Sequence, residues 1–336
     1  MKMPKPTMMD VAARAGVSQA TVSLILNGSP GARFSEETRR RVRDAAEALG
    51  YHLVQRGPAG AESSANQIAF VVDELTSDPW TALSYEGARE YALERGVTVT
   101  LSVSRSARLV YEEHLKHYET VPLIGMLYAT TLTREISLTP AFFRMPTVLV
   151  NCYDAKRRLP SVLPGDVEGG RTATQRLIAA GRRRIGFING QEGIDCCRDR
   201  LLGYRQALAS SDISFDPDLV WNGNWEPPAG YEGTRAFLAL PEPPDAIFCG
   251  NDTMAIGCYE ALKEAGLRIP QDISVIGFDD REIAQFMRPP LTTLLMPQYD
   301  VGAAAAALLL DQVGGLTPRH NQLKLECELV ERQSVA

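Results

Sequence analysis

The sequence has little of what enzymes, metalloproteins and membrane proteins require. It contains four histidines and six cysteines, and no two cysteines have the CxxC spacing of metal or redox sites. No phosphate-binding loop, GxGxxG fingerprint, GxSxG elbow or HExxH zinc motif occurs. The longest apolar run, near 303–310, is about half the length that spans a bilayer. We therefore expect no enzyme, no metal site, no cofactor and no membrane contact.

The cysteines and the N-terminus indicate the compartment. The cysteines are scattered, and the adjacent Cys196 and Cys197 are poorly placed to bridge each other. Lys2 and Lys5 precede Asp10 without the apolar stretch of a secretory signal peptide. These features predict reduced, structural thiols and a cytoplasmic protein.

Positive charge is concentrated at one end of an acidic chain. The whole chain has 35 Lys and Arg against 41 Asp and Glu, which gives a net charge of −6. Residues 1–60 hold nine basic and five acidic side chains, a balance of +4, so the remainder carries −10. A basic head on an acidic body predicts that the head alone approaches nucleic-acid phosphates.

The stretch 7–28 has the pattern of two short helices joined by a tight turn. Gly16 ends the first helix, where a residue without Cβ adopts a left-handed conformation cheaply. Ser18 is placed to cap the second helix, whose inward face includes Val22 and Ile25. The pattern predicts a helix-turn-helix whose second helix enters the DNA major groove. The alternative is an ordinary hairpin of two helices with a polar outer face.

Strands and helices alternate from residue 67 onward. Near-continuous apolar runs such as 68–73 are typical of parallel strands covered on both faces. The expected strands are 68–73, 97–103, 123–129, 147–151, 184–190, 246–252 and 273–280, and the expected helices are 79–95, 168–180, 198–209 and 253–265. The alternation continues for about 270 residues, which is more than one open sheet with its helices usually contains. We therefore expect two α/β lobes with a cleft between them.

Several phrases of the sequence carry a resemblance to a known family. DVAARAGVSQATVSLILNG and SEETRRRVRDAAEALGY resemble the DNA-binding head of the lac-repressor (LacI/GalR) family. GRRRIGFINGQEGIDCCRDRLLGYRQAL, FCGNDTMAIGCYEALKEAGLRIPQDISVIGFDD and PPLTTLLMP are similar to its body. The resemblance covers nearly the full length. It implies an all-α head and a periplasmic-binding-protein-like (type I) body with parallel sheets, in which each lobe is assembled from discontinuous segments.

The resemblance also implies domain boundaries. We expect a helix-turn-helix domain at 1–50, a hinge at 51–66 and an effector-binding domain at 67–336, with lobe 1 at about 67–166 and 296–324 and lobe 2 at about 167–295 and 325–336. Family members carry a hinge helix with a leucine that enters the minor groove. Here Leu53 and Val54 replace a common Pro-Asn pair, and Gly57, Pro58 and Gly60 oppose helix. Whether this linker folds on DNA is left open.

Residue roles in the head follow from the same resemblance. Gln19 and Ala20 occupy the positions that read base edges, and Leu24 stands where an arginine is frequent. Glutamine can pair with adenine, whereas alanine offers only a methyl contact to thymine. The other expected DNA contacts, mainly to phosphates, are Thr7, Ser18, Thr21, Ser23, Asn27 and Arg33.

Polar residues at the ends of apolar runs are candidates for a ligand site, because ligands of open α/β sheets bind beyond the carboxyl ends of strands. They are Asp73, Asn151, Asn251 and Asp279. Each of them could instead be a helix cap or a turn residue. Because the four hold equivalent positions, we expect a shared binding role.

The resemblance adds further effector contacts. Arg200 begins RLLGY, where the family places an arginine that reaches the ligand, and Ile194 and Cys196 fall where it lines the site. Trp80 and Trp225 match aromatic positions, and a flat ring fits a pyranose face or a base. We expect a neutral carbohydrate, with a purine and an acidic or phosphorylated sugar as alternatives.

These observations together predict a transcriptional regulator, namely a repressor that binds a palindromic operator as a homodimer or a larger tetramer. A small ligand between the lobes would control its operator affinity. The alternative is a solute-binding protein for transport, against which the basic head and the missing signal peptide argue.

Overall fold

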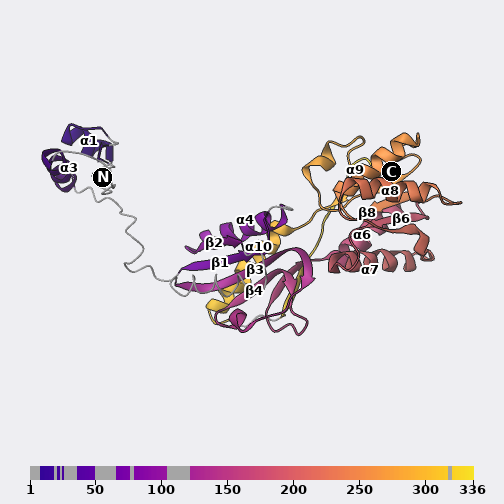
Figure 1. Cartoon of the computed structure of the whole chain (residues 1–336), viewed down its shortest axis with the longest axis horizontal. Helices are drawn as coiled ribbons and strands as arrows, with labels where there is room; N and C mark the ends of the chain where they lie inside the picture. Colours follow the sequence, from indigo (N-terminus) through magenta and orange to yellow (C-terminus); the bar gives the residue numbers. More distant parts are fainter. Residues whose placement is uncertain are drawn as a thin grey trace. The chain divides into compact units, whose positions relative to one another are not determined.

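The computed structural model describes residues 8–18, 21–22, 25, 36–49, 66–75, 79–103, 122–316 and 320–336. The chain forms two compact units, Met1–Ser64 and Ala65–Ala336, which Figure 1 draws in sequence colours. The expected hinge at 51–66 lies outside the described residues apart from Asn66. Its boundaries, and those of the two lobes, stay predictions.

The first unit contains the helices α1 (Met8–Ala15) and α3 (Glu36–Ala48). Val22 and Ile25, the expected inward face of the second helix, are buried together with Val42 of α3. Gly16 has the left-handed φ of +64° that the turn requires. The backbone N–H of Thr21 donates to Ser18 Oγ at 3.1 Å, as in a helix cap. The other DNA-contact candidates, Thr7, Gln19, Ala20, Ser23, Leu24, Asn27 and Arg33, lie outside the described residues.

The second unit begins with a six-stranded parallel sheet. Its strands are β1 (Gln67–Val72), β2 (Thr98–Val103), β3 (Leu123–Glu135), β4 (Thr147–Tyr153), β5 (Ser161–Pro164) and β11 (Gln322–Leu325), in the order β11-β5-β4-β3-β1-β2. Alternate residues of β1 face opposite ways, as the period of two requires. Phe70 packs with α4 (Trp80–Leu93) and α10 (Gln298–Val313), whereas Val71 packs with η1 (Pro140–Phe143).

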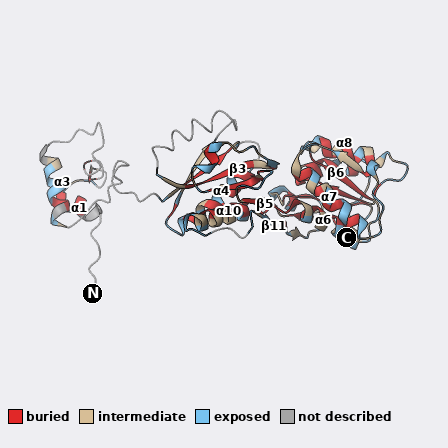
Figure 2. Ribbon diagram, turned by 90° about the horizontal axis from the view of Figure 1, so that it is seen from below, coloured by how far each residue is buried: buried red, intermediate tan, exposed pale blue. Residues whose placement is uncertain are grey.

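A second, four-stranded parallel sheet forms the other lobe. Its strands are β7 (Val220–Asn222), β6 (Ile185–Asn189), β8 (Ala246–Cys249) and β9 (Ser274–Ile276), in that order. Its helices are α6 (Asp166–Ala179), α7 (Asp195–Ala209), α8 (Pro227–Leu238) and α9 (Asp252–Glu264). Phe248 packs with α6 and α7, and its neighbour Cys249 packs with α8 and α9. The two helix pairs therefore cover opposite faces of the sheet. Figure 2 shows the strands of this sheet in the colour of buried residues.

The chain crosses between the lobes more than once. After β9 come η3 (Glu282–Gln285) and β10 (Thr293–Leu294), which pairs antiparallel with β12 (Leu329–Val330). Between these two strands the chain returns to the first lobe, where it contributes α10 and β11. Val335 then packs in the core of the second lobe. Each lobe is therefore assembled from discontinuous segments, as expected.

The sequence patterns located most elements to within a few residues. Differences occur where a strand is short or where no apolar run marks it, as for β5, β7 and β10–β12, and the helices α8 and α10 were not among the expected ones. β3 extends six residues beyond the predicted strand end at residue 129. All six cysteines are buried and free. Among the described residues no helix is long and apolar enough to cross a membrane.

Candidate ligand-binding site

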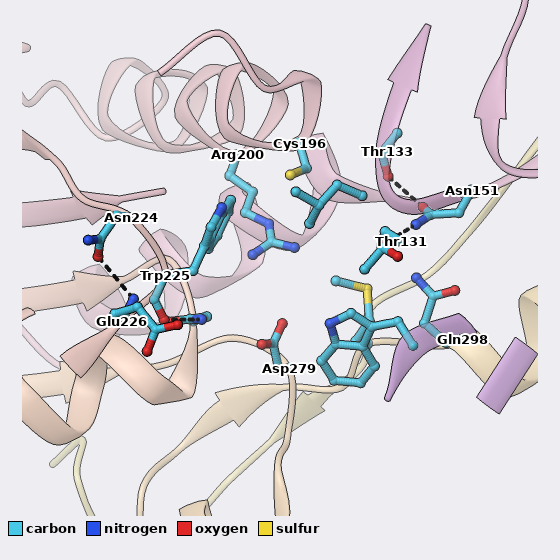
Figure 3. A pocket seen from close by; sticks show the side chains of 14 residues that line it. Thr131, Thr133, Asn151, Cys196, Arg200, Asn224, Trp225, Glu226, Asp279 and Gln298 are labelled. Carbon is cyan, nitrogen blue, oxygen red and sulfur yellow. Dashed lines mark hydrogen bonds between the residues drawn. The ribbon is translucent and has the colours of Figure 1, made fainter. Parts of the chain in front are cut away.

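A cavity lies between the two lobes, and seven of the nine effector-site candidates line it (Figure 3). They are Trp80, Asn151, Cys196, Arg200, Trp225, Asn251 and Asp279. The seven further lining residues are Thr131, Leu132, Thr133, Asn224, Glu226, Met296 and Gln298. The first lobe contributes α4, β3, β4 and α10, and the second contributes α7 and the loops after β7, β8 and β9. A ligand in this cavity would therefore touch both lobes.

Arg200 is buried on α7, with its guanidinium held from behind. Its Nε donates to Asp166 Oδ1 at 2.8 Å, and its Nη1 donates to the Gly250 carbonyl at 2.5 Å. The guanidinium carbon lies 3.6 Å from the centroid of the Phe278 ring. Burial raises the pKa of Asp166, and the charge of Arg200 opposes that rise. The short distance and the burial of both side chains make Asp166 and Arg200 a buried ion pair.

Close helix packing creates this ion pair. Asp166 is the first residue of α6, where the helix dipole favours a negative charge. A Cβ at Gly170 of α6 would lie 2.4 Å from the backbone carbonyl oxygen of Arg200. Only glycine at this position allows α6 and α7 to approach so closely, and the approach places Asp166 and Arg200 side by side.

Asn151 lines the cavity, and its side chain also holds the neighbouring segment of β3. Its Nδ2 donates to the carbonyls of Thr130 and Thr131, both at 2.9 Å, and its Oδ1 accepts from Thr133 Oγ1 at 2.6 Å. Between Ala129 and Arg134 the pairing of β3 with β4 is irregular, and residues 131–133 line the cavity there. The amide of Asn151 therefore holds an irregular segment of β3 in place, and its hydrogen-bonding groups are largely occupied.

Asn251 lines the cavity and is also a helix cap, the alternative that the sequence allowed. Its Oδ1 accepts from the Met254 N–H at 2.8 Å and so caps α9. Its Nδ2 donates to the Trp225 carbonyl at 3.0 Å. Trp225 has an unusual φ of +73°, which costs free energy in a residue with a Cβ. Asn251 thus stabilises the loop that presents the Trp225 indole to the cavity.

Two buried polar atoms of the lining have no hydrogen-bond partner among the described residues. They are Nε1 of Trp225 and Oγ1 of Thr131. A buried donor or hydroxyl without a partner is unfavourable, by about 1–3 kcal/mol. Both atoms belong to cavity-lining residues, so a ligand there could satisfy an indole N–H donor and a hydroxyl.

Asp279 follows β9 and lies beside a cation of its own lobe. Arg281 Nε is 3.5 Å from Asp279 Oδ2. The Arg281 guanidinium carbon is also 5.1 Å from the centroid of the Trp80 ring on α4 of the other lobe. This cation–π contact therefore joins the two lobes next to the cavity.

The other two candidates, Asp73 and Ile194, are not among the lining residues. Asp73 pairs with Arg134, whose Nη2 is 2.5 Å from Asp73 Oδ2, and burial raises the pKa of Asp73. Ile194 precedes α7 at the N-cap position. Both residues are close in sequence to lining residues, Asp73 to Trp80 and Ile194 to Cys196, but neither side chain lines the cavity.

Sequence reasoning missed half of the lining. Asn224 and Glu226 are the sequence neighbours of Trp225, so the choice of Trp225 as a candidate could have extended to them. Thr131 and Thr133 follow an apolar run as TTLT, a polar signal that would have placed them at the strand end. Met296 and Gln298 lie where the chain crosses back to the first lobe, and only the tertiary fold brings them to the cavity.

Comparison with known proteins agrees with this architecture. Residues 7–53 match the family of bacterial regulatory proteins, lacI family, and residues 174–335 match the periplasmic binding protein-like domain. The chain is 33% identical to the HTH-type transcriptional repressor CytR of Escherichia coli (strain K12), over 98% of this chain and 96% of the relative. It is 30% identical to the ribose operon repressor of Haemophilus influenzae (strain ATCC 51907 / DSM 11121 / KW20 / Rd), over 98% of each chain.

A solved structure of similar length has the same fold. The transcriptional regulator CelR in complex with cellobiose superimposes with a TM-score of 0.68 at 32% identity, covering 98% of this chain and 99% of that one. The similarity extends over the head and the body, across 98% of this chain. The chain therefore belongs to the lacI family of bacterial regulatory proteins, and it is a DNA-binding transcriptional regulator and not an enzyme.

Proposed function

We propose that this chain is a repressor whose operator affinity is controlled by a neutral carbohydrate bound between the lobes. The observation that carries the proposal is the pair of tryptophans, Trp80 and Trp225, in a cavity with carboxylate, amide and hydroxyl groups. Flat apolar rings suit the C–H faces of a sugar, and mixed donors and acceptors suit its hydroxyls. Two of the similar proteins are a ribose operon repressor and a regulator in complex with cellobiose.

The charges around the cavity favour a neutral ligand over an anionic one. The cation of the lining, Arg200, already pairs with Asp166 at 2.8 Å. Of the two lining carboxylates, Asp279 has Arg281 at 3.5 Å, and Glu226 at the exposed rim adds only a weak repulsion of an acidic or phosphorylated sugar. A neutral ligand needs no countercharge, and it would accept hydrogen bonds from the guanidinium edge that faces the cavity.

We propose further that the protein acts as a homodimer in the cytoplasm on a palindromic operator, with a tetramer as the larger alternative. One helix-turn-helix reads a short half-site, so a dimer doubles the length that is read.

A thermal unfolding screen tests the carbohydrate proposal. The full-length protein is heated with neutral mono- and disaccharides, with purine bases and with nucleosides, and Trp225→Ala is the matched control. A ligand at 100 times its dissociation constant should stabilise the protein by about 2.7 kcal/mol, and Trp225→Ala should lose this gain. Stabilisation by bases or nucleosides and by no sugar would contradict the proposal.

The second step of the test measures the output. A fluorescent operator duplex is titrated with protein, with and without the sugar that gave the shift. A coupling of about 1–3 kcal/mol changes operator affinity about 5- to 150-fold. A fall identifies an inducer and a rise identifies a corepressor. An unchanged operator affinity would show that sugar binding is not coupled to DNA.

A further inference from the structure

Arg200 has two sides with different environments. On one side, Nε and Nη1 are bound to Asp166 and to the Gly250 carbonyl. On the other, the residue lines the cavity, where Figure 3 shows the guanidinium pointing between Trp225 and Asp279. Asp166 itself is only 1% exposed and is not among the lining residues. It can therefore influence a ligand through the charge of Arg200 but cannot touch it.

The charge balance of the cavity depends on this hidden carboxylate. The charged lining residues are Arg200, Glu226 and Asp279. Arg281, 3.5 Å from Asp279, compensates that carboxylate. Without Asp166, the buried guanidinium would lose the carboxylate with which it is paired, and an anion in the cavity would be its natural partner. With Asp166, that attraction is cancelled.

We propose that Asp166 is the specificity residue that makes this cavity prefer neutral over anionic ligands, acting as a positioning and charge-balancing partner behind Arg200. The inference rests on the proposed function, since it explains why an arginine-containing site takes an uncharged ligand. Asparagine at this position would accept the same hydrogen bond from Arg200 Nε but would carry no charge. The Asp166→Asn exchange therefore separates the effect of the charge from the geometry.

The experiment uses inorganic phosphate as the anionic probe with the full-length protein. Thermal unfolding of wild type and Asp166→Asn is followed against phosphate concentration, with chloride at matched ionic strength as the reference. The DNA-binding head and general salt effects are the same in both proteins, so their difference reports the cavity. Asp166→Asn should bind phosphate at least about tenfold more tightly, as expected for removal of one charge near the site.

Three further variants make the result specific. Asp166→Glu keeps the charge and should behave as wild type. The double variant D166N/R200Q has no buried guanidinium, so its phosphate affinity should return to the wild-type level. Glu226→Gln also removes one negative charge, but at the exposed rim of the cavity. It should raise phosphate affinity less than about threefold, because Asp166 still balances Arg200.

The proposal is overturned if Asp166→Asn gains no phosphate affinity, or if the gain survives in D166N/R200Q. It is also overturned if Glu226→Gln alone gains tenfold, a test that needs no change at Asp166 and so holds even if Asp166→Asn does not fold. None of these outcomes depends on which sugar binds. Failure of the sugar screen with a positive phosphate result would therefore reject the proposed effector and leave the role of Asp166 standing.

Discussion

The indole of Trp225 lies directly against Gly190, so that a Cβ at residue 190 would stand 2.1 Å from the ring atom Cζ2. Gly190 follows the end of β6, and Asn251 holds the backbone of Trp225 from the other side. The position of the ring is therefore set by one missing side chain and one hydrogen bond. A flat surface in the cavity depends on both.

We predict that Gly190→Ala displaces the indole and weakens effector binding by at least about tenfold, which corresponds to about 1.4 kcal/mol of lost contact. Operator affinity without ligand should stay unchanged, because the head is a separate compact unit. Effector titration and operator binding are measured on the same preparation. Gly314→Ala is the matched control, because a Cβ there meets no atom closer than 3.4 Å. Equal effector affinity in both variants would contradict the assigned position of Trp225.

A second prediction concerns Asn151, whose backbone has a left-handed φ of 56°. Asn151→Ala removes three hydrogen bonds and places an alanine where its Cβ is strained, by about 1–2 kcal/mol. Asn151→Gly removes the same hydrogen bonds without that strain. Urea unfolding should therefore rank wild type above Gly, and Gly above Ala. Both variants should lose effector affinity, because residues 131–133 are no longer held. Wild-type affinity in Asn151→Gly would show that the amide does not position this segment.

The sequence located the strands because buried parallel strands are continuous apolar runs, and β1 is buried along nearly its whole length. It could not separate direct ligand contacts from residues that hold other residues. Asn151 and Asn251 end apolar runs as predicted, but their amides are bound to protein groups. Similarly, the partner of Arg200 lies 34 residues away, on another helix. Such pairings come from helix packing and strand register, which no local pattern encodes.

A third prediction concerns the contact of α7 with the first lobe. Asp195 Oδ2 accepts from the Tyr153 hydroxyl at 2.8 Å and from the Glu135 N–H at 3.0 Å. These bonds join α7 of the second lobe to β3 and β4 of the first, and we expect them to help set the angle between the lobes. Tyr153→Phe removes one hydrogen bond to a charged group and should lower the free energy of unfolding by about 1–2 kcal/mol.

The effector affinity of Tyr153→Phe should also fall. Without the hydrogen bond, part of the free energy of effector binding is needed to bring the two lobes together. Urea unfolding and effector titration measure the two effects. Tyr128→Phe is a suitable control, since Tyr128 lies in the same sheet and packs against Phe142. Reduced stability without any change in effector affinity would mean that the Tyr153 bond does not contribute to the lobe angle.

A fourth prediction addresses the head, where Ser18 Oγ accepts from the Thr21 N–H. Ser18→Ala should destabilise the head by about 1 kcal/mol, and Ser18→Gly by a few tenths. Both variants also lose the predicted phosphate contact of Ser18. Operator and random duplexes should therefore be bound more weakly by the same factor, because phosphate contacts carry no sequence information. Salt-dependent binding to both duplexes measures this, and a change in their affinity ratio would assign Ser18 to base readout.

The last prediction follows from the pair of Asp154 and Arg158. Asp154 Oδ2 accepts from Arg158 Nε at 2.9 Å and Oδ1 accepts from Nη2 at 2.7 Å. The Arg158 guanidinium lowers the pKa of Asp154 to about 2, whereas in the unfolded chain it is about 3.9. A lowered folded-state pKa stabilises the protein above the unfolded value, and the contribution is lost as the pH falls toward 2. The stability difference between wild type and Asp154→Asn should therefore be constant from pH 7 to 5 and shrink between pH 4 and 2. Urea unfolding across this pH range measures the difference in free energy of unfolding. A difference that does not change with pH would show that the charge of the Asp154 carboxylate does not contribute to stability.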